Sequence, residues 1–231
     1  MKNICENIEF IKNTINSIKN ASVAVDIIAV TKTFPCQDVL GALKCEIKHI
    51  GESKIQEALP KFERLGASLA GVTKHFIGRL QSNKAKKAVE NFDLIHSLDS
   101  IKLAKDIDCC AASSSKAQHC LIEVKVSLES SKTGVSPQDV KEFYKQCQAF
   151  PNVLIRGLMV IAPYSENHED SRSYFKQVYN LFEDIKKSFD KPNFDVLSMG
   201  MSGDYKIAVE EGSTMVRIGS AIFGERNYGN K

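Results

Sequence analysis

Eight short apolar runs recur along this chain, and segments with a helical spacing of apolar residues separate them. The runs cover residues 26–31, 47–52, 73–78, 93–98, 119–126, 154–161, 194–200 and 215–219. The intervening spacing predicts helices near 37–45, 53–66, 82–91, 99–112, 136–148, 167–189 and 204–212. Most runs are apolar almost throughout rather than alternating, which is typical of parallel strands whose two faces are both covered. The pattern therefore predicts an α/β fold with a parallel sheet.

Eight strand–helix units favour a closed (βα)8 TIM-type barrel over an open doubly wound sheet. Such a barrel needs about 250 residues, and this chain has 231. No Pro/Gly/Ser-rich linker divides it, so we expect a single barrel domain over residues 1–231. Before the first strand, Ile8, Ile11, Ile15 and Ile18 recur at helical spacing. They predict an extra N-terminal amphipathic helix.

Charge and cysteine content exclude several classes of protein. The net charge is only +3, from 31 basic and 28 acidic residues, so we expect neither nucleic acid nor an anionic membrane as a partner. No run of 18 apolar residues and no signal-peptide core occurs, so we expect no membrane span. The seven cysteines are an odd set without a CxxC pair, which argues against a disulfide framework or a zinc ribbon. These features favour a reducing compartment, the cytoplasm.

The first candidate functional residue is Lys32, which directly follows the first apolar run. Functional residues of barrels lie at the carboxyl ends of the strands. A lysine with its stem packed there can hold its amine over the barrel mouth and attack an aldehyde as the free amine. Taken alone, however, a solvated lysine at a strand end is the more common arrangement.

Two turns rich in Gly and Ser follow the seventh and eighth runs. The first contains Gly200, Ser202 and Gly203, and the second contains Gly219 and Ser220. Loops at these places in barrels often bind phosphate through backbone N–H groups. Either turn alone is equally compatible with a tight βα connection closed by a capping residue. The two together favour a phosphate site.

Arg217 lies between these two turns, within the eighth run. Its side chain points into the barrel if the strand also places Met215 and Gly219 on the inner side, and it is a surface arginine otherwise. A guanidinium facing a pyridine nitrogen donates a hydrogen bond to it and keeps that nitrogen unprotonated. A pyridine ring held in this way is a poor electron sink, which discourages carbanion chemistry.

Long sequence motifs over roughly residues 5–228 resemble the pyridoxal-phosphate homeostasis protein family. The motifs are AVTK at 29–32, HFIGRLQSNK at 75–84, HSLDS at 96–100, SKTG at 131–134, RGLMVIAP at 156–163 and GSTMVRIGSAIFGER at 212–226. They stand in the family's order and spacing. The resemblance implies a barrel similar to the N-terminal domain of alanine racemase, which holds pyridoxal 5′-phosphate as a covalent aldimine on Lys32.

The resemblance also implies roles for residues near the cofactor. Arg217 matches the arginine that faces the pyridine nitrogen, while Ser202, Gly219 and Ser220 match positions that hold the phosphate. Ser53 stands where the family usually has an Asn near the cofactor, and the shorter side chain leaves its contact with the cofactor open. Where the family commonly has Thr, Ser220 preserves the hydroxyl.

His75 belongs to a motif whose role its spacing does not reveal, so a structural and a cofactor-proximal position both remain open. Four histidines fall in strand runs, but no HxH or HExxH pair occurs, so we expect no metal site.

Two functions compete. The first is a non-enzymatic carrier or buffer of pyridoxal phosphate that contributes to cofactor homeostasis and passes the cofactor to apo-enzymes. The second is a racemase-like enzyme, which requires acid/base groups on both faces of the bound substrate. In alanine racemase one of these groups comes from a second domain of a partner subunit. Because this chain stops at Lys231, we expect a monomer without efficient catalysis.

Overall fold

The strands of the protein form one closed parallel barrel. In the computed structural model, the described residues are 3–18, 24–127, 133–189 and 193–225. The strands are β1 (Asp26–Val30), β2 (His49–Glu52), β3 (Thr73–Phe76), β4 (Leu94–Leu98), β5 (Gln118–Val124), β6 (Val153–Val160), β7 (Val196–Ser198) and β8 (Met215–Ile218). They pair in sequence order, and β8 pairs with β1 to close the ring. The predicted (βα)8 barrel is therefore confirmed.

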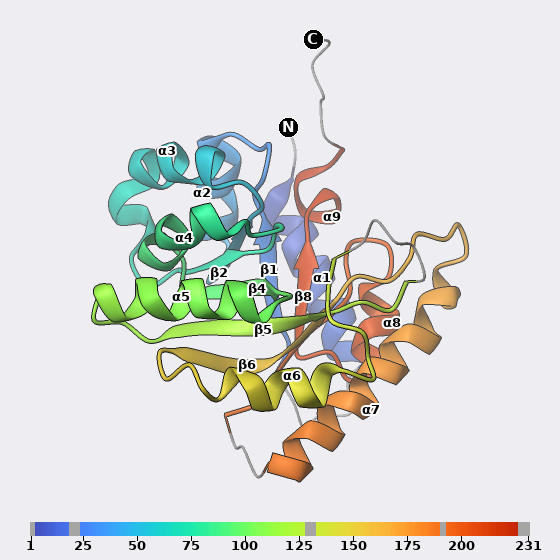
Figure 1. Ribbon diagram of the computed structural model, residues 1–231. Coiled ribbons are helices and arrows are strands. Elements are labelled where there is room, and N and C mark those ends of the chain that lie inside the picture. The colour runs from blue at the N-terminus through green and yellow to red at the C-terminus, as the bar shows by residue number, and fades with distance from the viewer. Residues whose placement is uncertain (1–2, 19–23, 128–132, 190–192, 226–231) are drawn as a thin grey trace.

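The helices surround this barrel (Figure 1). They are α1 (Ile4–Ile18), α2 (Cys36–Lys44), α3 (Ile55–Leu65), α4 (Ala85–Asn91), α5 (Ile101–Ser113), α6 (Val140–Cys147), α7 (Ser171–Phe189), α8 (Tyr205–Glu210) and α9 (Ser220–Phe223). Short 3-10 helices follow α3 and precede α4 and α7. Within the described part of the chain, no helix is long and apolar enough to cross a membrane.

Most helix boundaries agree with the sequence prediction to within two or three residues. The α-helical part of α7 begins at Ser171, four residues after the expected 167, and follows a 3-10 helix (His168–Asp170). Helix α6 also begins four residues late. It was expected to begin at 136 and begins at Val140. The Asp139 N–H instead donates to the Ser136 carbonyl oxygen at 2.9 Å, and the Ser136 hydroxyl donates to the Asp139 carboxylate. This local turn satisfies the polar groups that a first helical turn would otherwise use.

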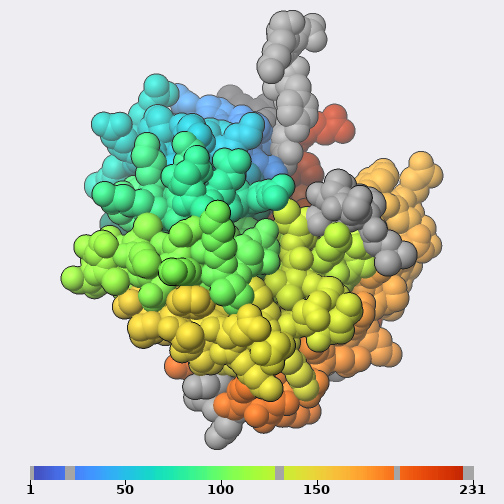
Figure 2. Space-filling view, in the orientation of Figure 1, coloured from blue at the N-terminus to red at the C-terminus, as the bar shows by residue number. Residues whose placement is uncertain are grey.

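Apolar side chains fill two separate regions, the inside of the barrel and the layer between strands and helices. The interior cluster consists of Ile28, Leu94, Leu121, Met159 and Met215. The outer layer is larger, and Figure 2 shows the side chains of α5 and α6 closing over the strands that Figure 1 leaves visible. The barrel is thus a packed core and not a pore.

A bulge in β6 depends on glycine. The register between β5 and β6 shifts from Cys120 opposite Ile155 to Leu121 opposite Gly157. Gly157 has a φ of +151°, and a Cβ there would lie 1.8 Å from the Val196 carbonyl oxygen. Only glycine fits so close an approach of two backbones. The bulge sets the register in which β6 continues to the barrel mouth.

The predicted N-terminal helix is present as α1, with Ile8, Ile11 and Ile15 buried against the outer layer. A disulfide joins Cys5 of α1 to Cys45 at the end of α2. The sequence analysis did not expect this bond, because the two cysteines are 40 residues apart and carry no motif. Packing of α1 on α2 brings their Cα atoms to 5.5 Å, and the other five cysteines are free thiols.

Candidate functional site

The loops that carry the candidate residues all leave the same end of the barrel, because every strand is parallel to its neighbours. Lys32 follows β1, Ser202 follows β7, and Gly219 follows β8. Ile28 of β1 lies opposite Arg217 of β8. The closure of the barrel therefore makes neighbours of residues from the two ends of the sequence.

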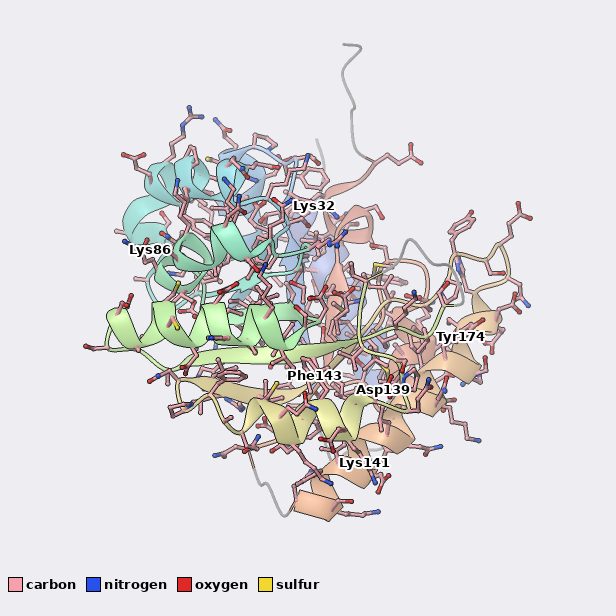
Figure 3. The ribbon with its side chains drawn as sticks, viewed as in Figure 1. Lys32, Lys86, Asp139, Lys141, Phe143 and Tyr174 are labelled. Carbon is pink, nitrogen blue, oxygen red and sulfur yellow. A yellow bond between two sulfur atoms is a disulfide. The ribbon has the colours of Figure 1, made fainter. Side chains whose placement is uncertain are left out.

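Lys32 continues the inner face of β1. Ile28 belongs to the interior cluster while Ala29 belongs to the outer layer, so side-chain alternation places Val30 and Lys32 on the inner side. Lys32 is half-buried, and Figure 3 shows it just beyond the carboxyl end of β1. The predicted position of this lysine at the barrel mouth agrees with the structure.

A buried ionic cluster fixes the backbone on both sides of Lys32. The Lys61 ammonium donates to the Thr31 carbonyl oxygen at 2.7 Å, to Glu52 Oε1 at 2.6 Å and to Glu57 Oε1 at 3.0 Å. Glu57 also accepts from the backbone N–H of Thr33, whose φ is +69°. The residues before and after Lys32 are therefore both tied to the cluster, which restricts where its side chain can start.

Burial and hydrogen bonding act in opposite directions on the two carboxylates of this cluster. Desolvation raises the pKa of Glu52, although hydrogen bonds from Lys61 and Thr31 lower it in part. Desolvation also opposes ionisation of Glu57, but hydrogen bonds from Thr33 and Lys61 lower the pKa of this carboxyl overall. Lys61 is thus the cation that pairs with both carboxylates and favours their ionised forms. The sequence analysis missed it, since a lysine within a helix carries no distinguishing signal.

Ser202 joins the two Gly- and Ser-rich turns. Its hydroxyl oxygen accepts from the backbone N–H of Gly219 at 3.3 Å and from that of Ala221 at 3.2 Å. Gly200 has a φ of +94°, and a Cβ there would lie 2.6 Å from the Cβ of Ala208. A glycine at 200 therefore lets the first turn approach α8 and meet the second turn. The hydroxyl of Ser220, at the start of α9, is on an exposed residue.

Ser53 lies apart from these turns. It is half-buried after β2 and lines a cavity of about 400 Å³ together with Gln81 and Lys84. The structure thus brings together Ser202 and Gly219, whereas Ser53 follows β2, which pairs with β1 on the edge of β1 away from β8.

Arg217 lies inside the barrel, on the same side of β8 as Met215, as the parity argument required. Its NH1 group donates to the Ser198 carbonyl oxygen at 2.9 Å and to the Ser198 hydroxyl at 2.7 Å, and its NH2 group donates to the Val160 carbonyl oxygen at 2.8 Å. Burial lowers the pKa of Arg217 to about 10, so the guanidinium remains charged at neutral pH.

A second carboxylate, Glu123, lines a cavity of about 300 Å³ at the barrel mouth with Met159 and Ile161. Desolvation raises the pKa of Glu123, and the nearby Asp99 raises it further, while Thr133 donates a hydrogen bond to it. The sequence analysis did not single out this residue. The sequence feature that could have identified it is a charged side chain inside the apolar run 119–126.

Histidines fill the polar part of the barrel interior. His75 is buried, with its Nε2 atom 3.0 Å from His49 Nδ1 and its Nδ1 atom 2.9 Å from His96 Nε2. The His96 Nδ1 atom lies 3.2 Å from the Ser198 hydroxyl. Across the described residues, no group of three His, Cys, Asp or Glu side chains could hold a metal ion.

Comparison with known proteins places the chain in a class. Residues 3–227 match the family model described as "Alanine racemase, N-terminal domain". An alanine racemase of Clostridium difficile 630 shares the fold with a TM-score of 0.70 at 14% identity, and the match covers 96% of this chain and 57% of that chain. The fold and the site define a barrel of the alanine racemase N-terminal class.

More similar relatives narrow this class to one family. A pyridoxal phosphate homeostasis protein of Aquifex aeolicus is 42% identical over 202 residues, 87% of each chain. That of Pasteurella multocida is 35% identical over 98% of this chain and 97% of its own. PipY of Synechococcus elongatus, solved with PLP bound, has a TM-score of 0.85 at 34% identity and covers 96% of this chain and 100% of its own. The chain belongs to the pyridoxal phosphate homeostasis protein family.

Removing the cation of the ionic cluster is expected to destabilise the protein strongly. Lys61→Met leaves Glu52 buried without its partner, so we expect the free energy of unfolding in urea to fall by about 3–5 kcal/mol. Replacing both partners, in Lys61→Met with Glu52→Gln, is expected to recover part of the loss. Lys86→Met, on the exposed face of α4, is the matched control and should change stability by about 0.5 kcal/mol or less. Equal stability of the single and double variants would contradict the proposed dependence.

The burial of His75 predicts how the stability of the folded protein changes with pH. Desolvation, with a smaller contribution from His49, lowers the pKa of His75 to about 3, whereas a histidine in the unfolded chain has a pKa near about 6.5. The unfolded state therefore binds the proton first, and His75 contributes a loss of stability of about 1.4 kcal/mol per pH unit as the pH falls from about 6.5 towards 3, in addition to the loss from the buried His96.

Urea unfolding at several pH values between about 6.5 and 5 measures this slope. His75→Gln is expected to flatten it, since it removes the group that protonates only in the unfolded state. His168→Gln, in the exposed loop before α7, is the control for the loss of a histidine. Identical slopes for the wild type and His75→Gln would show that His75 is not kept neutral by folding.

Proposed function

We propose that this protein binds pyridoxal 5′-phosphate as a Schiff base on Lys32 and serves as a carrier or buffer in the homeostasis of that cofactor. The observation that supports the proposal is that Lys32 follows β1, while the buried Arg217 guanidinium belongs to the paired strand β8 and the joined turns around Ser202 and Gly219 follow β7 and β8. These are the groups that an aldehyde, a pyridine nitrogen and a phosphate require.

The phosphate end of the cofactor fits the joined turns. Two backbone N–H groups, those of Gly219 and Ala221, converge on the Ser202 hydroxyl. Converging backbone donors of this kind suit a phosphate oxygen, with the hydroxyls of Ser202 and Ser220 as further partners. Ser53 follows β2, the other strand that pairs with β1, and we propose that it contributes to the edge of the cofactor site from there.

The ring end fits Arg217. A guanidinium carries five N–H donors, and three hydrogen bonds to Ser198 and Val160 account for part of them among the described residues. The remaining donors suit a pyridine nitrogen. When bound, the cofactor supplies an aldehyde and an electron-withdrawing ring. An unprotonated ring nitrogen withdraws electrons weakly, so this arginine favours storage of the cofactor over turnover.

The proposal also covers the domain organisation, oligomeric state, partners and location of the protein. We propose that residues 1–231 act as one cofactor-binding domain and as a monomer, with pyridoxal phosphate and apo-enzymes that need it as partners, and without nucleic acid or membrane. We further propose that it works in the cytoplasm, where the reducing systems would keep Cys5 and Cys45 as thiols. Five cysteines that are already free support this location.

Lys32→Ala is expected to abolish covalent binding. Wild-type protein mixed with pyridoxal phosphate and desalted should keep an absorbance band near about 420 nm, typical of a lysine Schiff base of this cofactor. Borohydride reduction followed by peptide mapping should label Lys32, and the variant should show neither the band nor the label. Lys54→Ala, at an exposed lysine before α3, is the matched control. A label on another lysine would refute the assignment.

The absence of efficient catalysis is tested separately. With L-alanine and the cofactor-loaded protein, we expect racemisation to remain at the rate of free pyridoxal phosphate, because the arginine leaves the ring a weak electron sink. Chiral chromatography of the amino acid measures the rate, with alanine racemase as the positive control. Turnover that Lys32→Ala abolishes would support the racemase-like alternative instead.

A further inference from the structure

A line of hydrogen-bonding groups runs through the barrel interior from Arg217 of β8 to His49 of β2. It passes from the guanidinium through the Ser198 hydroxyl and then through His96, His75 and His49. The four successive distances between the polar atoms along it are 2.7, 3.2, 2.9 and 3.0 Å. These groups come from five different strands, and the function proposed above uses only the first of them.

The Arg217 end fixes the direction of every bond in this line. A guanidinium only donates, so the Ser198 hydroxyl accepts from it and has its own proton to give. The His96 Nδ1 atom is the neighbour that can accept this proton. His96 is then protonated on Nε2 alone, because desolvation lowers its pKa well below the usual range and keeps the ring neutral.

The protonated nitrogen atoms of the next two rings follow from that of His96. His96 donates from Nε2 to His75 Nδ1, so His75 carries its proton on Nε2 and donates to His49 Nδ1. His49 in turn carries its proton on Nε2, which lies 3.6 Å from Asp26 Oδ1. That distance is too long for a hydrogen bond, but the carboxylate attracts an N–H and repels a nitrogen lone pair.

Arg217 at one end and Asp26 at the other thus both require each hydrogen bond of the line to be donated in the direction from Arg217 towards Asp26. In the reverse arrangement, the lone pair of His49 Nε2 would point at the Asp26 carboxylate. The Ser198 hydroxyl would accept hydrogen bonds from both Arg217 and His96, and its own proton would have no acceptor among these groups. Aligned hydrogen bonds polarise one another in a medium of low dielectric. The line also cannot deliver a proton to Arg217, since that group is already protonated.

We infer that this polarised chain of three histidines and a serine positions the Arg217 guanidinium and offsets the burial of its charge. The inference deepens the proposed function, on which it rests for the role of Arg217 toward the cofactor ring. Ser198 and His96 are positioning residues that act through Arg217. His75, His49 and Asp26 extend the polarised chain to the half-exposed start of β1.

The first test reads the ring protons directly. We expect 15N-histidine-labelled protein, free of cofactor and near neutral pH, to show protonated Nε2 and unprotonated Nδ1 atoms for His49, His75 and His96 in long-range 1H–15N spectra. Single His→Gln variants assign the signals. An Nδ1-protonated tautomer at any of the three rings would overturn the inference, whether or not the protein binds pyridoxal phosphate.

A second test asks whether the chain acts as a unit. Ser198→Ala removes the donor that sets the direction, so we expect all three histidines to lose their single tautomer together. Ser198→Thr keeps a hydroxyl and should restore it, and Ser113→Ala at the exposed end of α5 should leave the spectra unchanged. A change confined to His96 would show separate hydrogen bonds instead of a chain.

The third test measures the effect on Arg217 through the bound cofactor. Loss of one hydrogen bond to a charged group is expected to weaken retention of pyridoxal phosphate by Ser198→Ala about tenfold, with Ser198→Thr close to the wild type. Unchanged retention by Ser198→Ala would refute the positioning role. A wild type without the band at about 420 nm would refute the function of Lys32 and leave the tautomer result standing.

Discussion

The burial of the Arg217 charge inside the barrel is the constraint around which the polar interior is arranged. A guanidinium removed from water needs acceptors, and the apolar cluster of Leu121 and Met159 supplies none. The acceptors come from the edges of neighbouring strands, from the Ser198 carbonyl and hydroxyl and from the Val160 carbonyl. These two carbonyl groups belong to the last residues of β6 and β7.

A second buried cation, Lys61, performs a comparable task outside the ring of strands. It joins the Thr31 carbonyl oxygen to two carboxylates and so holds the loop that begins at Lys32. One cation thus lies on each side of the barrel wall, and each is tied to a different part of the candidate site. Buried ion pairs of this type add little net stability. Their value here is the fixed geometry of the groups that they bind.

The sequence was sufficient for the architecture and for the part of the site that lies in loops. Apolar runs and turn residues mark strands and βα connections directly, so the barrel, Lys32 and the Ser202–Gly219 turns were predictable. The inward side chain of Arg217 followed only on the condition that β8 turns Met215 to the inside, which the structure shows. The partners of Lys61 and the line of histidines were not predictable, because they depend on which residues of distant strands face each other. The Cys5–Cys45 disulfide was not predictable from the sequence for the same reason, since it follows from the packing of α1 on α2.

The order of the barrel explains why a site split between the two ends of the sequence is compact. In an open doubly wound sheet, the first strand lies inside the sheet and the last at an edge, so the two are not paired neighbours. Closure pairs β1 with β8 and sets Ile28 beside Arg217. The loop after β1 and the phosphate-type turn after β8 then leave adjacent strands in the same direction. The proposed ligand, which carries an aldehyde and a phosphate arm on neighbouring ring carbons, would therefore face both loops.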